Sequence, residues 1–143
     1  FKTGEEIKQE ERTIDTSNMR PLTVLLAEDQ PMNQMVAIDT LEGMFPGITI
    51  DVANNGQEAV DHASKKKYDL IFMDVHMPVM DGYNATINIR NSGGLNAQSP
   101  ILALTANAVR EEIDKCLASG MNRHLAKPFE PEKLKQTVIE LTA

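Results

Sequence analysis

Residues 69–82 read DLIFMDVHMPVMDG, and they combine a short apolar run with a carboxylate and an abrupt end to regular structure. An apolar run bounded by turn signals is typical of a strand buried on both faces of a sheet. Pro78 cannot continue a strand ladder and Asp81-Gly82 predicts a turn, so we expect Asp74 at the carboxyl end of the strand. Ligands of open parallel α/β sheets bind at that edge.

Four other apolar runs alternate with helical patterns, and each is a predicted strand. They comprise residues 22–27, 48–53, 101–104 and 124–126. Strands that alternate with helices predict a parallel sheet with right-handed crossovers and helices on both faces. We therefore predict a flavodoxin-like, doubly wound (βα)5 fold with a five-stranded parallel sheet in the order 2-1-3-4-5. The alternation within residues 48–53 favours a position near the sheet edge.

Several residues mark the expected helix boundaries. Pro31 and Pro131 suit the first turn of a helix, and Gly120 suits a helix end. The basic run at residues 65–67 is predicted to be a solvated helix terminus. Cys116 lies on an apolar helical stripe and is predicted to pack in the core.

Composition limits the class of protein. The 143 residues suit one domain, and 41% hydrophobic with 24% charged residues is ordinary for a globular domain. We expect no membrane contact by this domain, because neither a bilayer-spanning apolar segment nor a signal-peptide pattern stands out. A formal net charge of -7 argues against direct nucleic-acid binding. The single cysteine excludes an internal disulfide and fits a reducing compartment, which we expect to be the cytoplasm.

Residues 1–20 differ from the remainder of the chain. They include nine charged side chains, few apolar ones and no clear period. We expect them to be a charged linker from a preceding domain, and residues 21–143 to be the folded domain. Because the sequence begins at Phe1, we also expect it to be a piece of a longer protein.

Functional groups follow four of the predicted strands at the point where each strand ends. They are Glu28 and Asp29, Asp74, Thr105 and Lys127. Each has a simple structural explanation when taken alone, such as a helix cap or a surface lysine. The carboxyl ends of parallel strands share one edge, so we expect these side chains to converge there. A salt bridge between Lys127 and Asp74 without a metal is the alternative, and it leaves Glu28 and Thr105 unexplained.

Three neighbouring carboxylates repel one another by roughly 4 kcal/mol per pair at an effective dielectric constant of about 20. That repulsion favours a divalent cation, and oxygen ligands without Cys or paired His favour Mg²⁺ over Zn²⁺. A carboxylate beside such a metal can attack phosphorus and form an aspartyl phosphate. Lys127 and the Thr105 hydroxyl are then suited to bind the other phosphoryl oxygens.

The chain resembles the receiver domain of two-component response regulators over about residues 21–143. The resemblance rests on Glu28-Asp29, on DVHMPVMDG at residues 74–82, on Thr105-Ala106 and on Lys127-Pro128-Phe129. It implies that Asp74 is the phospho-acceptor and takes a phosphoryl group from a phosphohistidine. It also implies that the domain promotes its own aspartyl phosphorylation and dephosphorylation.

The same resemblance implies a metal site. The side chains of Asp29 and Asp74 would bind Mg²⁺ together with the main-chain carbonyl of His76. Glu28 would act largely through water.

The resemblance further implies a conformational switch formed by Thr105 and His124. Thr105 would move onto the phosphoryl group, and His124 occupies a position where the family more often has Tyr or Phe. His76 and Asn107 flank the family's path for the hydrolytic water, so we expect them to tune the phosphoryl lifetime. The bond between Lys127 and Pro128 is often cis in the family.

Residues 30–34, QPMNQ, resemble receivers at the C-terminus of hybrid sensor histidine kinases. The partners implied are the phosphohistidine domain of a histidine kinase and a histidine phosphotransfer domain or protein, so that the domain relays phosphate. A receiver that controls an output domain is the alternative.

Three more distant alternatives are disfavoured. A phosphatase of the haloacid dehalogenase type needs a second Asp where this chain has His76. A flavodoxin is disfavoured because no Ser/Thr/Gly-rich phosphate loop follows the first strand. The complete set of acids, Thr105 and Lys127 argues against a pseudo-receiver that only binds a partner.

Overall fold

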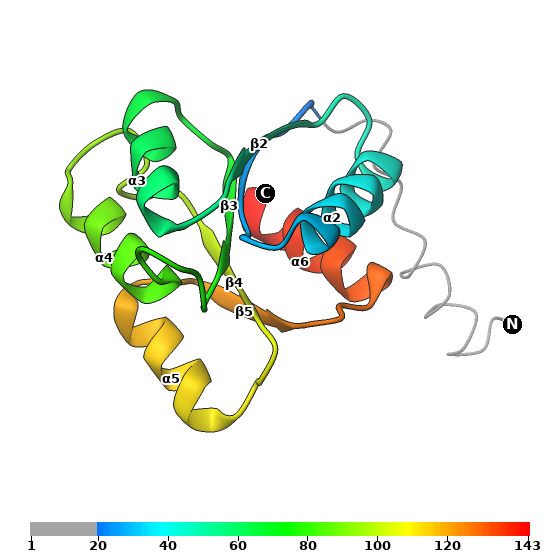
Figure 1. Cartoon of the computed structure of the whole chain (residues 1–143). Coiled ribbons are helices and arrows are strands. Elements are labelled where there is room, and N and C mark those ends of the chain that lie inside the picture. The colour runs from blue at the N-terminus through cyan, green and yellow to red at the C-terminus, as the bar shows by residue number, and fades with distance from the viewer. Residues whose placement is uncertain (1–19) are drawn as a thin grey trace, which may run out of the picture.

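Five parallel strands form the centre of the protein in the order β2-β1-β3-β4-β5 (Figure 1). The computed structural model describes residues 20–143, so the predicted linker lies outside the described residues except for Arg20. The strands are β1 (Thr23–Ala27), β2 (Thr49–Ala53), β3 (Leu70–Asp74), β4 (Ile101–Thr105) and β5 (Arg123–Ala126). This order confirms the predicted flavodoxin-like fold, and β2 lies at a sheet edge as its alternation indicated.

Within residues 20–143, five helices connect and cover the strands. They are α2 (Pro31–Met44), α3 (Gly56–Lys65), α4 (Gly82–Asn91), α5 (Arg110–Ser119) and α6 (Pro131–Thr142). Figure 1 shows α2 and α6 on one face of the sheet, and α3, α4 and α5 on the other. As predicted, Pro31 and Pro131 begin their helices, and Gly120 ends α5 in the left-handed region with φ of 113°. None of these helices is long and apolar enough to cross a membrane.

Alternate residues of the central strands pack into two separate apolar cores. Ile71 and Met73 belong to the core that also contains residues of α3, α4 and α5. Leu70 and Phe72 belong to the core shared with α2 and α6. Because side chains alternate between the faces of a strand, a strand covered on both sides is apolar along its length. Asp74 is the one polar residue of β3, and it lies at the carboxyl end of the strand.

The basic run at residues 65–67 lies at the exposed end of α3, as predicted, and two of its lysines also contact other parts of the fold. The helix ends at Lys65, and Lys66 Nζ lies 3.0 Å from Asp51 Oδ2 on β2. Lys67 Nζ donates to Ser99 Oγ at 3.0 Å. These partners are distant in sequence, and no local pattern indicates them.

The loop from β3 to α4 packs against glycines that allow unusually close contacts. A Cβ at Gly82 would lie 2.2 Å from the main-chain oxygen of Asp74. A Cβ at Gly56 would lie 2.2 Å from the main-chain oxygen of Met80, which accepts the Gly56 N–H at 2.9 Å. Val79 in the same loop has φ of 69°, a strained value for a β-branched residue. The loop is therefore held close to the main chain of Asp74.

Gly82→Ala is expected to destabilise the protein by about 2–4 kcal/mol, because the added methyl group collides with main-chain atoms that cannot easily move. Gly43→Ala in α2 is the matched control, since a Cβ there meets nothing within 4 Å. The control is expected to be neutral or to stabilise by about 0.5–1 kcal/mol through helix propensity. Urea unfolding measures both changes, and equal stability of the two variants would contradict the close contact.

Candidate active site

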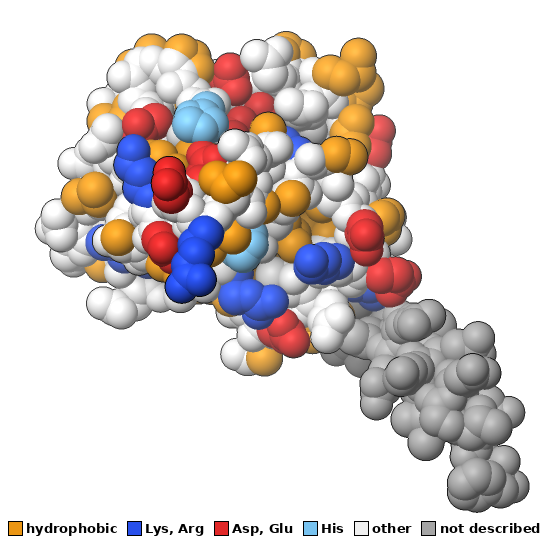
Figure 2. Space-filling model, turned by 90° about the horizontal axis from the view of Figure 1, so that it is seen from below, with side chains coloured by type: hydrophobic (Ala, Val, Ile, Leu, Met, Phe, Trp, Pro, Cys, Tyr) orange, Lys and Arg blue, Asp and Glu red, His pale blue; other side chains and the backbone are white. Residues whose placement is uncertain are grey.

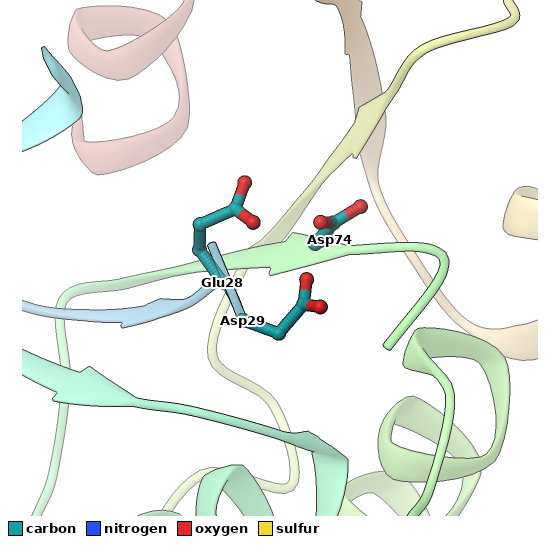
Figure 3. A group of neighbouring side chains, drawn as sticks. All are labelled: Glu28, Asp29 and Asp74. Carbon is teal, nitrogen blue, oxygen red and sulfur yellow. The ribbon is translucent and has the colours of Figure 1, made fainter. Parts of the chain in front are cut away.

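Three carboxylates meet at the carboxyl edge of the sheet (Figure 3). Glu28 and Asp29 directly follow β1, and Asp74 is the last residue of the neighbouring strand β3. One oxygen of each carboxylate lies within 4.8 Å of the others. Glu28 and Asp74 are only 2% and 5% exposed, so this negative charge is largely removed from water.

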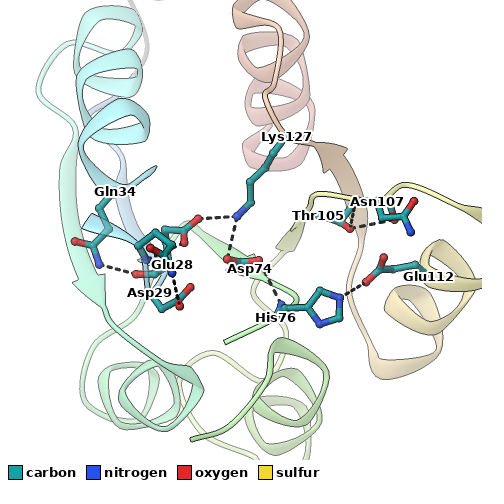
Figure 4. A network of polar contacts seen from close by, with 10 residues as sticks. Glu28, Asp29, Gln34, Asp74, His76, Thr105, Asn107, Glu112 and Lys127 are labelled. Atoms are coloured by element: carbon teal, nitrogen blue, oxygen red, sulfur yellow. Dashed lines mark hydrogen bonds and ion pairs between the residues drawn. The ribbon is translucent and has the colours of Figure 1, made fainter. Parts of the chain in front are cut away.

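Lys127 brings a positive charge from the end of β5 into this acidic cluster (Figure 4). Its ammonium lies between two acids, 2.8 Å from Glu28 Oε1 and 2.9 Å from Asp74 Oδ2. The main-chain N–H of Lys127 donates to the carbonyl of Thr105 at 2.7 Å, which fixes the loop after β5 beside β4. The bond between Lys127 and Pro128 is cis.

The pKa values of the two acids that share Lys127 are shifted in opposite directions. Burial raises the pKa of Asp74 to about 6, although the Lys127 ammonium opposes this rise and the Glu28 charge adds to it. Burial also acts to raise the pKa of Glu28, but hydrogen bonds from Lys127 and the Gln30 N–H outweigh it and hold that pKa below its ordinary value. Burial lowers the pKa of Lys127, yet both carboxylates together raise it above normal. The charged forms of Lys127 and Glu28 are therefore favoured, whereas the charged form of Asp74 is disfavoured.

The donor set fits a hard divalent cation. Both oxygens of Glu28 are already engaged, Oε1 by Lys127 and Oε2 by the main-chain N–H of Gln30 at 3.1 Å. Asp74 Oδ2 is engaged by Lys127 too, but its Oδ1 accepts only the long bond from the His76 N–H, and Asp29 Oδ2 accepts only the Gln30 side-chain amide at 3.2 Å. Asp29 and Asp74 Oδ1 are therefore more available than Glu28 to bind a metal directly. Carboxylate oxygens clustered without Cys or His suit Mg²⁺.

Thr105 lies at the same edge, but its hydroxyl contacts the following loop. Thr105 is fully buried at the end of β4, where its Oγ1 accepts the Asn107 N–H at 3.1 Å and lies 3.2 Å from the Asn107 carbonyl. His124 on β5 is half-buried and pairs in register with Ala103. Since Ala103 and Thr105 are two residues apart, His124 and Thr105 lie on the same face of the sheet.

His76 is connected to α5 as well as to Asp74, and the sequence did not indicate the first of these contacts. Its main-chain N–H donates to Asp74 Oδ1 at a long 3.3 Å. Its imidazole points away from Asp74 in Figure 4, where Nε2 lies 2.8 Å from Glu112 Oε1. Sequence reasoning missed Glu112, because an acid in the first turn of a helix is already explained by the helix dipole.

The family model of the response regulator receiver domain matches residues 24–139, a span that contains every site residue described above. The fold and the match together define a signalling receiver. The chain belongs to the response regulator receiver domain family of two-component signalling.

Among curated proteins, the chain is similar to histidine kinases. It is 36% identical to Histidine kinase 5 of Arabidopsis thaliana over 92% of its own length and 16% of that protein. It is also 36% identical to Hybrid signal transduction histidine kinase G of Dictyostelium discoideum, over 85% of this chain and 4% of that one. The chain therefore spans only a small part of these relatives.

Two solved structures have the same fold at comparable identity. One is the receiver domain of sensor histidine kinase PA1611 from Pseudomonas aeruginosa, with a magnesium ion coordinated in its active-site cleft. It has 36% identity and a TM-score of 0.78, over 86% of this chain and 98% of that chain. The other is the Saccharomyces cerevisiae co-crystal of the histidine phosphotransfer protein Ypd1 with the receiver domain of its downstream response regulator Ssk1. Here the identity is 32% and the TM-score is 0.76, over 85% of this chain and 89% of that chain.

Asp74→Asn is expected to stabilise the metal-free protein at neutral pH. The pKa of Asp74 is about 6 in the folded protein, above its ordinary value of 3.8, so between these pH values the folded state holds a proton that the unfolded chain releases. Stability of the unmodified protein therefore falls as pH rises through this window. The variant should gain about 1–3 kcal/mol above pH 7, and the gain should vanish near pH 4.

Urea unfolding at several pH values measures this difference, with Asp39→Asn, an exposed acid on α2, as the control. A gain that does not change with pH would contradict the raised pKa of Asp74.

Proposed function

We propose that Asp74 accepts a phosphoryl group from the phosphohistidine of a histidine kinase, and that the domain relays it to a histidine phosphotransfer domain. The observation that carries this proposal is the half-buried Lys127 ammonium, 2.9 Å from Asp74 Oδ2. A cation at that position can bind a phosphoryl oxygen once Asp74 is modified. The family match and the similarity to histidine kinases support the same conclusion.

In the proposed transfer, a carboxylate oxygen of Asp74 attacks phosphorus and the bond from phosphorus to the imidazole nitrogen breaks. The departing imidazole keeps the electron pair and takes a proton from solvent, and Asp74 becomes an acyl phosphate. Lys127 neutralises charge on the transferred group. Because Glu28 holds Lys127 from the opposite side, the ammonium is positioned before the phosphodonor arrives.

The residues that would hold Mg²⁺ are Asp29, Asp74 and the main-chain carbonyl of His76, with Glu28 acting through water. The ion supplies positive charge for the phosphoryl oxygens when it is bound. The hydrogen bonds that occupy both Glu28 oxygens support an indirect role for this residue. The magnesium ion in the cleft of the similar PA1611 receiver also supports this assignment.

Thr105 and His124 are the proposed switch pair. For Thr105 to bind the phosphoryl group, its hydroxyl must leave the Asn107 main chain, so the loop between β4 and α5 would change. His124 lies two register positions from Thr105 on the same face, which suits a side chain that responds to this change.

A partner surface for the relay is proposed on α2. Met32, Met35 and Val36 are 71%, 60% and 53% exposed on this helix. Beside them is a cavity of about 570 Å³, whose lining includes Val36, Phe129 and Lys127. An apolar surface that leads to the phosphorylation site suits a helical histidine phosphotransfer partner, and the Ypd1 co-crystal of a similar receiver supports this choice.

The charge distribution agrees with a protein partner. Acidic and basic side chains are interspersed with apolar ones on the face shown in Figure 2. The net charge of the whole chain is -7, which does not favour binding to nucleic acid.

Incubation with acetyl phosphate or phosphoramidate and Mg²⁺ should modify Asp74, and mass mapping identifies the labelled residue. Asp74→Asn should abolish the label, and Asp29→Asn should weaken Mg²⁺ binding by about tenfold or more through loss of a ligand charge. Asp39→Asn should leave both unchanged. Persistent labelling of the Asp74 variant, or unchanged metal affinity of the Asp29 variant, would contradict these roles.

Met35→Glu should slow phosphoryl transfer from a phosphorylated histidine phosphotransfer protein that the unmodified chain accepts as donor. A loss of about tenfold is expected, because a charge replaces an apolar contact at the partner surface. Labelling by acetyl phosphate should not change. Ile87→Glu on α4 is the control, since Ile87 is an exposed apolar residue on the opposite face of the sheet. Equal loss in both variants would argue against docking on α2.

A further inference from the structure

His76 connects the candidate site to α5, because its main chain contacts Asp74 and its side chain contacts Glu112. Its main-chain N–H donates to Asp74 Oδ1, while its imidazole Nε2 lies 2.8 Å from Glu112 Oε1. The imidazole is thereby held on the α5 side of the loop, pointing away from Asp74 (Figure 4). Nε2 can donate this hydrogen bond in the neutral ring as well as in the charged ring.

Glu112 is itself fixed from a third element. The same Oε1 accepts the hydroxyl of Tyr83 at 3.1 Å, and Tyr83 is a buried residue of α4. Lys115 Nζ lies 4.5 Å from the centre of the Tyr83 ring and covers it from α5. The Glu112 side chain is only 11% exposed. Its carboxylate is therefore a rigid acceptor, whereas the His76 side chain that it holds is 73% exposed.

The contact orients His76 more than it stabilises the fold. A hydrogen bond or ion pair with one exposed partner contributes little to stability, because water competes for the exposed group. His76 has few other restraints on its side chain, and its main chain already faces Asp74. Released from Glu112, the imidazole can rotate toward the outer oxygens of Asp74, where a phosphoryl group would lie.

We propose that Glu112 is a positioning residue for phosphoryl lifetime: it holds His76 against α5 and so keeps the outer side of Asp74 open to water. This inference rests on the proposed phosphorylation of Asp74. In hydrolysis, water attacks phosphorus, the bond from phosphorus to the Asp74 oxygen breaks, and the carboxylate is regenerated. The phosphate leaves as H₂PO₄⁻ with both protons of the water. A released imidazole covers the attacking path and donates its N–H to a phosphoryl oxygen, which slows this step.

Glu112→Ala should lengthen the half-life of the acyl phosphate about three- to tenfold, measured by loss of label after the donor is removed. Glu112→Gln keeps an oxygen acceptor for His76 and Tyr83, so its half-life should stay close to that of the unmodified protein. Glu111→Ala is the matched control, because it removes the neighbouring exposed acid of the same helical turn. The imidazole ¹⁵N spectrum of His76 should change in Glu112→Ala and not in Glu111→Ala.

The decisive comparison uses His76→Ala as a background. Adding Glu112→Ala there should have no further effect on the half-life, because the residue that Glu112 orients is gone. The inference is overturned if Glu112→Ala shortens or does not change the half-life, or if its effect persists without His76. Failure of Asp74 to take up label at all would overturn the proposed function instead, so the two failures are distinguishable.

Discussion

The ion pairs of the half-buried Lys127 with the buried acids Glu28 and Asp74 are the interaction on which the site depends. Its ammonium lies within 2.9 Å of both acids, and neither acid is more than 5% exposed. Removing charges from water costs several kcal/mol per ion, and this cost is offset only when the partners meet in good geometry. One cation cannot fully compensate the two acids together with Asp29. Burial raises the pKa of Asp74, the Glu28 charge adds to that rise, and the remaining negative charge makes the cluster receptive to a divalent cation.

The fold keeps the charged groups of the site in this geometry by placing them on rigid elements. The strands that carry Asp74 and Thr105 are buried along their whole length, so their ends cannot easily move apart. Beyond β3, Gly82 lets the chain pass against the main-chain oxygen of Asp74. The candidate site is thus placed where stiff strands end and loops begin, which combines precise positioning with freedom to respond.

The two faces of the sheet have different relations to the site. On the face covered by α2 and α6, exposed apolar side chains lie beside the cavity that reaches Lys127. On the other face, α5 is connected to the site through the loop after Thr105 and through the contact of Glu112 with His76. We infer that a partner approaches over the first face and that changes at Asp74 are transmitted toward the second.

The sequence by itself determined the elements, their order and the residues at the strand ends. Apolar runs and the Pro and Gly boundaries are local signals, and the parallel topology then requires Glu28, Asp29 and Asp74 to share one edge. Only the tertiary structure decided which atoms meet. It directs Lys127 between Glu28 and Asp74, engages the Thr105 hydroxyl with Asn107, and connects His76 to Glu112. These contacts depend on side-chain direction and on packing between distant segments, and the periodicity of the sequence predicts neither of them.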